Sequence, residues 1–229
     1  MRKLSLFFIL LLCACSNSPT MAVEEKPVNI RYLALGDSYT IGESVEATER
    51  FPNQLADFLK AGGLQTEVTI IAKTGWTTNE LWDGIQASEI NPPYDLVSLL
   101  IGVNNQYRGY DINEYREQFV FLLNKSIEYA GGNPQRVIVL SIPDWGVTPF
   151  AHGQGGERIA RDIDAFNAVN RAETEKAGAQ YINITPISRE AAHDVTLIAG
   201  DGLHPSGKMY LEWAKLVYPV ALEALDISK

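Results

Sequence analysis

The chain has 229 residues, 46% of them hydrophobic and 21% charged, which suits a single α/β domain with a substantial core. Its formal net charge of -9 argues against a nucleic-acid partner, because binding to a phosphate backbone requires a basic surface. The sequence has no nucleotide-binding glycine motif and no clustered set of metal ligands, so we expect no cofactor and no metal.

The first residues have the pattern of a bacterial secretory signal. Arg2 and Lys3 precede an apolar run, residues 4–12, that is too short to span a bilayer. The Leu-Cys-Ala-Cys that follows resembles a bacterial lipobox, in which cleavage leaves Cys15 as the acylated first residue. We therefore expect a lipoprotein signal peptide over residues 1–14, the acylated cysteine and a polar tether over 15–28, and the folded domain over 29–229.

Cleavage before Cys15 determines which cysteine chemistry is available and at which membrane we expect the protein. Cys13 and Cys15 are the only cysteines, so the processed domain has no thiol for a disulfide or for catalysis. Anionic lipid would repel the acidic domain, so lipid chains on Cys15 must hold it at a bacterial membrane, on the extracytoplasmic side. Ser16 and Asn17 follow instead of the aspartate that retains similar lipoproteins in the inner membrane, which favours the outer membrane in a Gram-negative source.

From residue 29 onward, apolar strand-like runs alternate with segments of helical periodicity. The predicted strands are 30–35, 67–73, 96–102, 136–142 and 179–184, and the predicted helices are 51–61, 78–88, 111–130, 156–177 and about 206–225. Nearly continuous apolar strands that alternate with helices are typical of a parallel sheet covered on both faces. Because such sheets bind ligands beyond the carboxyl ends of their strands, we expect functional residues directly after the strands.

Polar residues and glycines follow all five predicted strands, at positions 37–38, 74–76, 102–105, 143–145 and 201–207. At the first of these strand ends, Ser38 has two interpretations. It is either part of an ordinary helix start after a glycine turn, or a nucleophile. The second interpretation requires a base, an acid that orients the base, and hydrogen-bond donors for an oxyanion.

The search for a base is short because the chain has three histidines. His152 lies in a glycine-rich loop without a carboxylate placed to orient it, and His193 lies at an exposed helix end or loop. His204 follows Asp201 by three residues, a spacing that lets a carboxylate oxygen reach Nδ1 and leaves Nε2 free to face a serine. This spacing alone is also typical of a turn cap, but the residues at the other strand ends favour the catalytic interpretation.

Four blocks of the sequence, taken in order, resemble the SGNH or GDSL-type hydrolase family over nearly the whole domain. They are GDSYTIG at 36–42, the region of Gly75, GVNN at 102–105 and DGLHPSG at 201–207. The resemblance implies a flavodoxin-like three-layer α/β/α sandwich with a five-stranded parallel sheet. It also implies a nucleophile at Ser38, a base at His204 and an acid at Asp201, with an oxyanion hole made by the backbone N–H groups of Ser38 and Gly75 and the Asn104 side chain.

The sequence departs from related patterns at two positions. The family's third block has an aspartate where this chain has Asn105, so the charged neighbour of the oxyanion asparagine is absent. Thr40 occupies the last position of the G-x-S-x-G elbow of classical lipases, which argues for the SGNH type over the α/β-hydrolase fold. Residues near the strand ends that could form the substrate rim, or simply pack, are Tyr39, Asn105, Tyr107, Asp144 and Trp145.

The expected reaction is hydrolysis of carboxylic esters, acyl or acetyl esters of small alcohols, lipids or sugars, through an acyl-enzyme. Two alternatives stay open. In the first, a sugar or lipid hydroxyl replaces water, and the same triad catalyses acyl transfer. In the second, the chain is a non-catalytic surface lipoprotein that binds glycans or lipids on the same scaffold.

Overall fold

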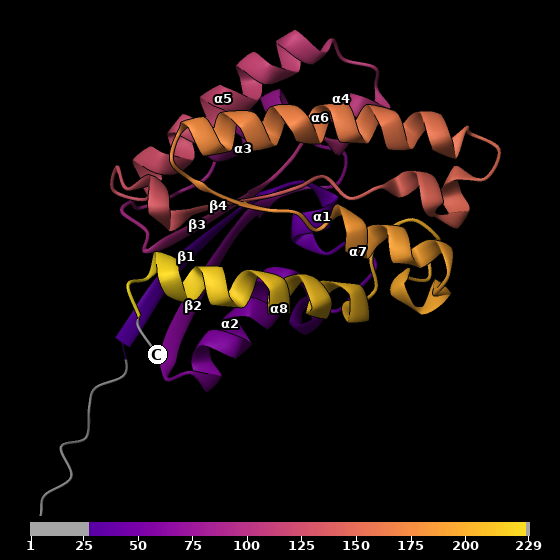
Figure 1. The fold of residues 1–229 in the computed structure, drawn as a ribbon. Coiled ribbons are helices and arrows are strands. Elements are labelled where there is room, and N and C mark those ends of the chain that lie inside the picture. The colour runs from indigo at the N-terminus through magenta and orange to yellow at the C-terminus, as the bar shows by residue number, and fades with distance from the viewer. Residues whose placement is uncertain (1–27, 228–229) are drawn as a thin grey trace, which may run out of the picture.

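Five parallel strands form the centre of the fold in the computed structural model, which describes residues 28–227 (Figure 1). The strands are β1 (Val28–Gly36), β2 (Leu64–Ala72), β3 (Leu96–Leu100), β4 (Val137–Leu140) and β5 (Gln180–Ile182). Their order across the sheet is β2-β1-β3-β4-β5, and every pairing is parallel. The strand order reverses beside β1, which is where an open α/β sheet forms a crevice for a ligand.

Helices cover both faces of the sheet and make the fold a three-layer sandwich. Figure 1 shows α3 (Thr78–Gln86), α5 (Ile112–Tyr129) and α6 (Gly156–Lys176) above the sheet, and α2 (Phe51–Ala61) and α8 (Gly207–Ala224) below it. The short helices α1 (Ser38–Ile41), α4 (Val103–Tyr107) and α7 (Thr185–Arg189) lie near the carboxyl ends of the strands. Single 3-10 turns cover 47–49, 134–136, 145–147, 149–151, 190–192 and 195–197. This architecture confirms the predicted fold class.

The five long helices match the predicted ranges closely, whereas β5 is shorter than its predicted range of 179–184. Beyond Ile182, the backbone N–H groups of Ile184 and Thr185 donate to the Ser141 hydroxyl, at 2.8 and 3.0 Å, instead of to a strand. The side chain of Ser141 therefore ends the sheet ladder here. At the other end of the domain, β1 begins at Val28, and the predicted signal peptide, Cys15 and nearly all of the tether lie outside the described residues.

The centre of the sheet is rigid because it is buried on both faces. Every residue of β3 and β4 is buried, as expected for strands that read as continuous apolar runs. The only polar side chain among them, Ser98, lies 2.7 Å from the Tyr32 hydroxyl of β1 and is thereby satisfied. Beneath the sheet, Trp213 and Tyr210 of α8 are fully buried with their rings edge to face at 5.1 Å. Such close packing of the core holds the ends of the strands in fixed positions.

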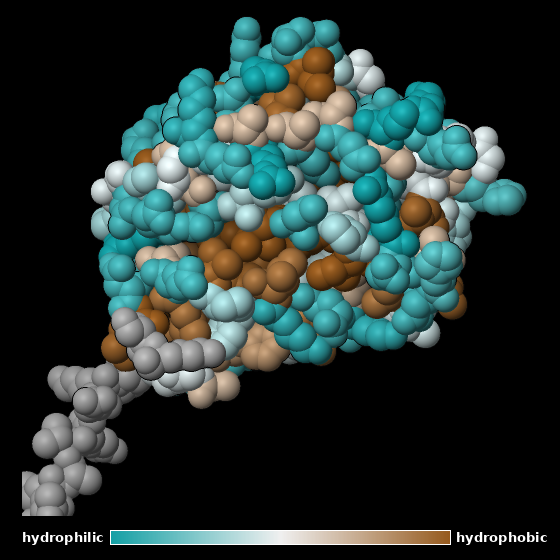
Figure 2. Space-filling view, in the orientation of Figure 1, coloured by the Kyte–Doolittle hydropathy of each residue, from teal (hydrophilic) through white to brown (hydrophobic). Residues whose placement is uncertain are grey.

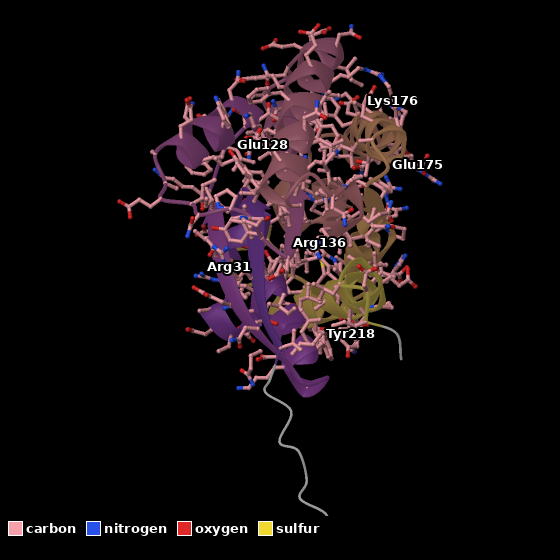
Figure 3. The ribbon with its side chains drawn as sticks, turned by 90° about the vertical axis from the view of Figure 1, so that its left-hand side faces the viewer. Arg31, Glu128, Arg136, Glu175, Lys176 and Tyr218 are labelled. Carbon is pink, nitrogen blue, oxygen red and sulfur yellow. The ribbon has the colours of Figure 1, made fainter. Side chains whose placement is uncertain are left out.

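The amino edge of the sheet carries structural contacts. Figure 3 looks onto this edge, with Arg31 and Arg136 among the labelled side chains. The Arg31 guanidinium donates to the Pro93 carbonyl at 2.7 Å and lies 4.8 Å from the centre of the Tyr94 ring, which ties β1 to the loop before β3. Apolar side chains also gather on the surface between α6 and α8, where the edge strand β5 is half-buried (Figure 2). Within residues 28–227, no helix is both long and apolar enough to cross a membrane.

Candidate active site

Ser38 is the first residue of α1, directly after β1. A Cβ at Gly36 would collide with the Thr40 side chain and with the carbonyl oxygen of Leu100, so only glycine fits at the end of β1. Asp37 caps the helix, because its Oδ1 accepts a hydrogen bond from the Tyr39 N–H at 3.0 Å. Ser38 is thus held at the start of a short helix, whose Tyr39, Thr40 and Ile41 N–H groups are bonded to Asp37.

The carboxyl group next to Ser38 is unusual in being completely buried. Burial raises the pKa of Asp37 to about 7, although its hydrogen bond from the Tyr39 N–H acts in the opposite direction. The Asp37 carboxyl group accepts the cap hydrogen bond from the Tyr39 N–H, and in this way it stabilises the turn at Ser38.

Asp201 and His204 form a tightly bonded pair in the loop before α8. The Nδ1 atom of His204 lies 2.6 Å from Oδ2 of Asp201. Oδ1 of the same carboxylate accepts the backbone N–H groups of Leu203 and His204 at 2.9 and 3.0 Å, and the Ser44 hydroxyl donates to Oδ2 at 2.7 Å. Partial burial raises the pKa of Asp201, but these four hydrogen bonds outweigh it and hold the pKa well below its usual range. An ionised Asp201 can only accept, so Nδ1 of His204 carries the proton and Nε2 is free to act as a base.

Gly75 lies in the turn after β2 with a φ of +84°, a conformation that only glycine adopts without strain. Its carbonyl oxygen accepts a hydrogen bond from Arg108 at 2.6 Å, and Arg108 in turn pairs with Glu80 at 3.1 Å. Glu80 also accepts the N–H of Thr77 in the capping box of α3. These contacts hold the carbonyl group of Gly75, in the peptide that joins it to Trp76, relative to α3 and α4.

Asn104 lies in α4, after β3, and its side chain reaches across to the Gly75 turn. Its Nδ2 donates to the carbonyl oxygen of Trp76 at 2.9 Å. An amide NH₂ group has two hydrogens, so one remains to bind another acceptor. The hydrogen bond to Trp76 thereby orients the amide group while leaving a donor available.

These residues meet around one cavity at the carboxyl edge of the sheet, with a volume of about 160 Å³. Ser38 and His204 both line it, at 4% and 8% exposure, together with Gly75 and Asn104. The remaining lining residues are Tyr39, Thr74, Val103, Tyr107, Trp145, Phe150 and Leu203. His152 and His193 are exposed and lie outside it. The structure thus brings together residues from all five strand ends named from the sequence, and also residues that follow them.

Three of the five residues predicted for the substrate rim line this cavity, namely Tyr39, Tyr107 and Trp145. The Tyr107 and Trp145 rings meet edge to face at 5.4 Å, and Phe150 lies 6.0 Å from Trp145 between ring centres. Trp145 is fixed by a hydrogen bond from its indole N–H to Gln106 at 2.9 Å. The result is an aromatic wall, Tyr107, Trp145 and Phe150, on one side of the cavity.

The other two rim candidates, Asn105 and Asp144, are placed behind the walls of the cavity. Asn105 is fully buried, where its Oδ1 accepts the Thr78 N–H at 3.1 Å and its Nδ2 donates to the Thr78 hydroxyl at 2.8 Å. The neutral amide therefore supports the start of α3 with both an acceptor and a donor, and an aspartate would supply only the acceptor. Asp144 is also buried, where it caps the 145–147 turn and pairs with Arg189 at 2.9 Å.

The sequence interpretation did not identify Phe150 or Leu203 as cavity residues, nor the contact of Ser44 with Asp201. Phe150 lies in a 3-10 turn with no periodic pattern, and its backbone N–H bonds to the carbonyl oxygen of Gly202 at 3.0 Å. Leu203 lies inside the DGLHPSG block but carries no chemical signal of its own. Among residues 28–227, no three His, Cys, Asp or Glu side chains are grouped as metal ligands would be.

The doubly wound sheet, with Ser38 and His204 lining one cavity at its carboxyl edge, has the architecture of SGNH-type hydrolases. The sequence model of the GDSL-like Lipase/Acylhydrolase family matches residues 34–211. The chain belongs to this family and is a carboxylic ester hydrolase, which decides against the non-catalytic alternative.

Solved structures of esterases share the fold. The structure of the psychrotrophic esterase EstA from Pseudoalteromonas sp. has a TM-score of 0.66 at 18% identity, with coverage of 86% of this chain and 98% of that chain. TesA has a TM-score of 0.64 at 19% identity, covering 85% and 99%. The acetylxylan esterase Axe2 from Geobacillus stearothermophilus has a TM-score of 0.64 at 18% identity, covering 89% and 98%. Comparison with curated proteins gives no significant match.

Proposed function

We propose that Ser38, His204 and Asp201 act as a catalytic triad that hydrolyses carboxylic esters through an acyl-enzyme. Nε2 of His204 takes the proton of the Ser38 hydroxyl as Oγ attacks the ester carbonyl carbon. His204 then gives this proton to the leaving alcohol oxygen as the ester C–O bond breaks, and water releases the acyl group by the same route. Asp201 keeps the imidazole in the required tautomer and stabilises its protonated form.

The oxyanion of the tetrahedral intermediate is held by the backbone N–H groups of Ser38 and Gly75 and by the Asn104 side chain. The anchoring of the Asn104 amide by the Trp76 carbonyl supports this assignment, and Arg108 holds the turn at Gly75 through the Gly75 carbonyl oxygen. Donors that are already oriented need no reorganisation during the reaction, and one such donor is worth roughly 100- to 1,000-fold in turnover.

The observation that carries this proposal is that His204, paired with Asp201, lines the same small cavity as Ser38. It is tested by pre-steady-state hydrolysis of a p-nitrophenyl ester. We expect an initial burst of nitrophenol close to one equivalent of enzyme, followed by a slower steady rate, because the acyl-enzyme accumulates where its hydrolysis is slower than its formation. Trapping with hydroxylamine should yield the acyl hydroxamate. An enzyme that hydrolyses the ester with neither a burst nor a trapped acyl group would contradict the acyl-enzyme.

The cavity favours short, apolar acyl groups. Its volume of about 160 Å³ is below the ~300–1,000 Å³ of pockets that hold drug-sized ligands, so it suits a small group. The aromatic wall, Val103 and Leu203 give it an apolar lining, and no Lys, Arg, Asp or Glu side chain is among its lining residues. We therefore infer that the acyl chain, of about four to six carbons, lies against the aromatic wall.

A series of p-nitrophenyl esters from acetyl to dodecanoyl tests this inference. We expect kcat/KM to rise at least about tenfold from acetyl to butyryl, since a methylene in an apolar pocket is worth ~1–3 kcal/mol, and to fall beyond hexanoyl. Phe150→Ala should weaken the preference for butyryl and move the optimum to longer chains, because the substitution opens the wall. The control is Phe121→Ala, since Phe121 on α5 is as exposed as Phe150, at 42% against 43%. Rates that keep rising to dodecanoyl in the unmodified enzyme would contradict the assigned acyl site.

Hydrolysis and acyl transfer differ only in which hydroxyl attacks the acyl-enzyme. Tyr107, at the wall of the cavity, is 55% exposed, so the site is open to solvent and water reaches the acyl-enzyme. Because the chain belongs to a family of lipases and acylhydrolases, we infer that water is the acceptor. Product analysis with a competing acceptor alcohol separates the two reactions, and acyl transfer is the correct description if the alcohol outcompetes water at millimolar concentration.

We propose that lipid chains on Cys15 anchor the domain to the extracytoplasmic face of a bacterial membrane, on the outer membrane in a Gram-negative source. The lipobox-like sequence supports this proposal, and residues 16–28 could extend at most about 45 Å from the anchor. The chain enters the domain at Val28, at the edge of the sheet opposite the cavity (Figure 1). A Cys15→Ser variant should lose incorporation of labelled palmitate and leave the membrane fraction. Membrane retention of the variant would contradict this anchor.

A further inference from the structure

Asp201 receives a hydrogen bond from a residue that lies far away in the sequence and directly after the nucleophile helix. The Ser44 hydroxyl donates to Oδ2 of Asp201 at 2.7 Å, and this is the same oxygen that lies 2.6 Å from Nδ1 of His204. Oδ1 is occupied by two backbone N–H groups of its own loop. Ser44 therefore adds the contact that links this carboxylate to the segment of chain carrying Ser38.

The backbone at Ser44 is held in a conformation that its residue type disfavours. Its φ is +64°, and among the described residues only one other non-glycine residue, Asp226, has a positive φ. A side chain with a Cβ is strained in this region, and such strain persists where the surroundings impose it, often at functional sites. Glycine would relieve the strain, but it has no hydroxyl. The serine thus combines an unfavourable backbone with a side chain that reaches Asp201.

The same turn also contacts the opposite side of the site. Glu43, next to Ser44, accepts a hydrogen bond from the hydroxyl of Thr74, the residue before Gly75. The backbone N–H of Glu43 bonds to the carbonyl oxygen of Ser38 at 3.0 Å. The turn after α1 is therefore attached to the nucleophile, to the Gly75 turn and to the acid of the proposed triad.

We propose that Ser44 is a positioning residue, whose hydroxyl holds the Asp201 carboxylate in register with His204 and so with Ser38. This inference rests on the proposed triad. Ser44 touches neither the substrate nor the reacting atoms, so it acts through the orientation of the imidazole. Loss of the Ser44 hydroxyl should therefore lower kcat and leave KM nearly unaltered.

Two substitutions at Ser44 separate the effect of the hydroxyl on activity from the effect of the backbone strain on stability. Ser44→Gly removes the hydroxyl and relaxes the backbone, so we expect kcat to fall about three- to tenfold with unchanged KM and an equal or higher Tm. The fall is modest because Ser44 is exposed and water partly replaces the lost donor. Ser44→Thr keeps the hydroxyl but adds a β-branch at positive φ, so we expect a lower Tm with kcat within twofold of the unmodified enzyme. Asp226→Gly is the matched control, since it relaxes the other positive φ and should leave kcat unchanged.

Steady-state kinetics of these variants on p-nitrophenyl butyrate, with Ser38→Ala beside them, decides the outcome. Loss of kcat in Ser44→Gly together with retention in Ser44→Thr supports the positioning role, because a merely structural residue would give activities that follow Tm. If kcat is unaltered in Ser44→Gly, the positioning role of Ser44 is overturned. If Ser38→Ala is inactive in the same experiment, the proposed triad still stands. Undiminished activity of Ser38→Ala would instead overturn the triad, and the role of Ser44 with it.

Discussion

Ser38→Ala is expected to lower kcat for ester hydrolysis by about 10⁴- to 10⁶-fold, the range for loss of the nucleophile in a serine hydrolase triad. The reason is that no other group in the cavity is placed to form the acyl-enzyme, whereas the oxyanion donors remain and account for residual rate above that of water. The measurement is kcat on p-nitrophenyl butyrate, with Tm as a check on folding.

The matched control for this variant is Ser88→Ala. Ser88 follows α3, and its hydroxyl donates to the carbonyl oxygen of Gly84 away from the cavity. We expect Ser88→Ala to retain unmodified kcat. Ser38→Ala with a native Tm and a kcat within tenfold of the unmodified enzyme would contradict the assignment of the nucleophile.

Asp201→Asn is expected to lower kcat by about 10⁴-fold with little change in KM. The amide oxygen can still accept the backbone N–H groups of Leu203 and His204, so the loop should keep its shape. An NH₂ group would then occupy the position of Oδ2 and donate to Nδ1 of His204. This hydrogen bond selects the imidazole tautomer with its proton on Nε2, which cannot take the proton of Ser38.

Asp162→Asn is a suitable control for this change, because Asp162 lies on α6 in a long 3.9 Å pair with Arg158, outside the cavity. It should not alter kcat. Asp201→Asn should also lose most of its activity across the whole pH range, since a wrong tautomer is not repaired by deprotonation at high pH. Recovery of near-native kcat at alkaline pH would show that Asp201 acts otherwise than by fixing the tautomer.

The architecture could be predicted from the sequence because the relevant signals are local. The apolar strands and the helical periodicity identified all five strands and five long helices. The rule that ligands bind at strand ends then placed Ser38, Gly75, Asn104 and His204 at one edge, and the structure brings these four residues to the same cavity.

The direction in which a side chain points was harder to predict, because it depends on neighbours from other elements. Asn105 directly follows Asn104 but turns away from the cavity, because the unpaired N–H of Thr78 at the start of α3 needs an acceptor. Asp144 lies next to Trp145 and is drawn behind the wall by Arg189 and the Gly146 N–H. Thr78 lies 27 residues from Asn105 and Arg189 lies 45 residues from Asp144, too far along the chain for the local sequence to signal these contacts.

Ser44 and Phe150 illustrate a second kind of residue that pattern reading misses. The contact of Ser44 with Asp201 spans 157 residues, and the positive φ that permits it leaves no trace in the local sequence. Phe150 reaches the cavity because its turn is bonded to Gly202, within the block that carries the acid and the base. Both depend on tertiary contacts that exist only after the sheet has brought the strand ends together.

The central claim, that Ser38 is an activated nucleophile, is tested most directly by covalent labelling with an alkyl phosphonate fluoride. Intact-mass and peptide mass spectrometry should find one phosphonyl group per chain, on Ser38, with hydrolysis lost in proportion to labelling. Ser38→Ala should take up no label, and His204→Ala should label far more slowly because its serine lacks a base. A phosphonyl group on a different residue, or full hydrolytic activity in an enzyme labelled at Ser38, would contradict the claim.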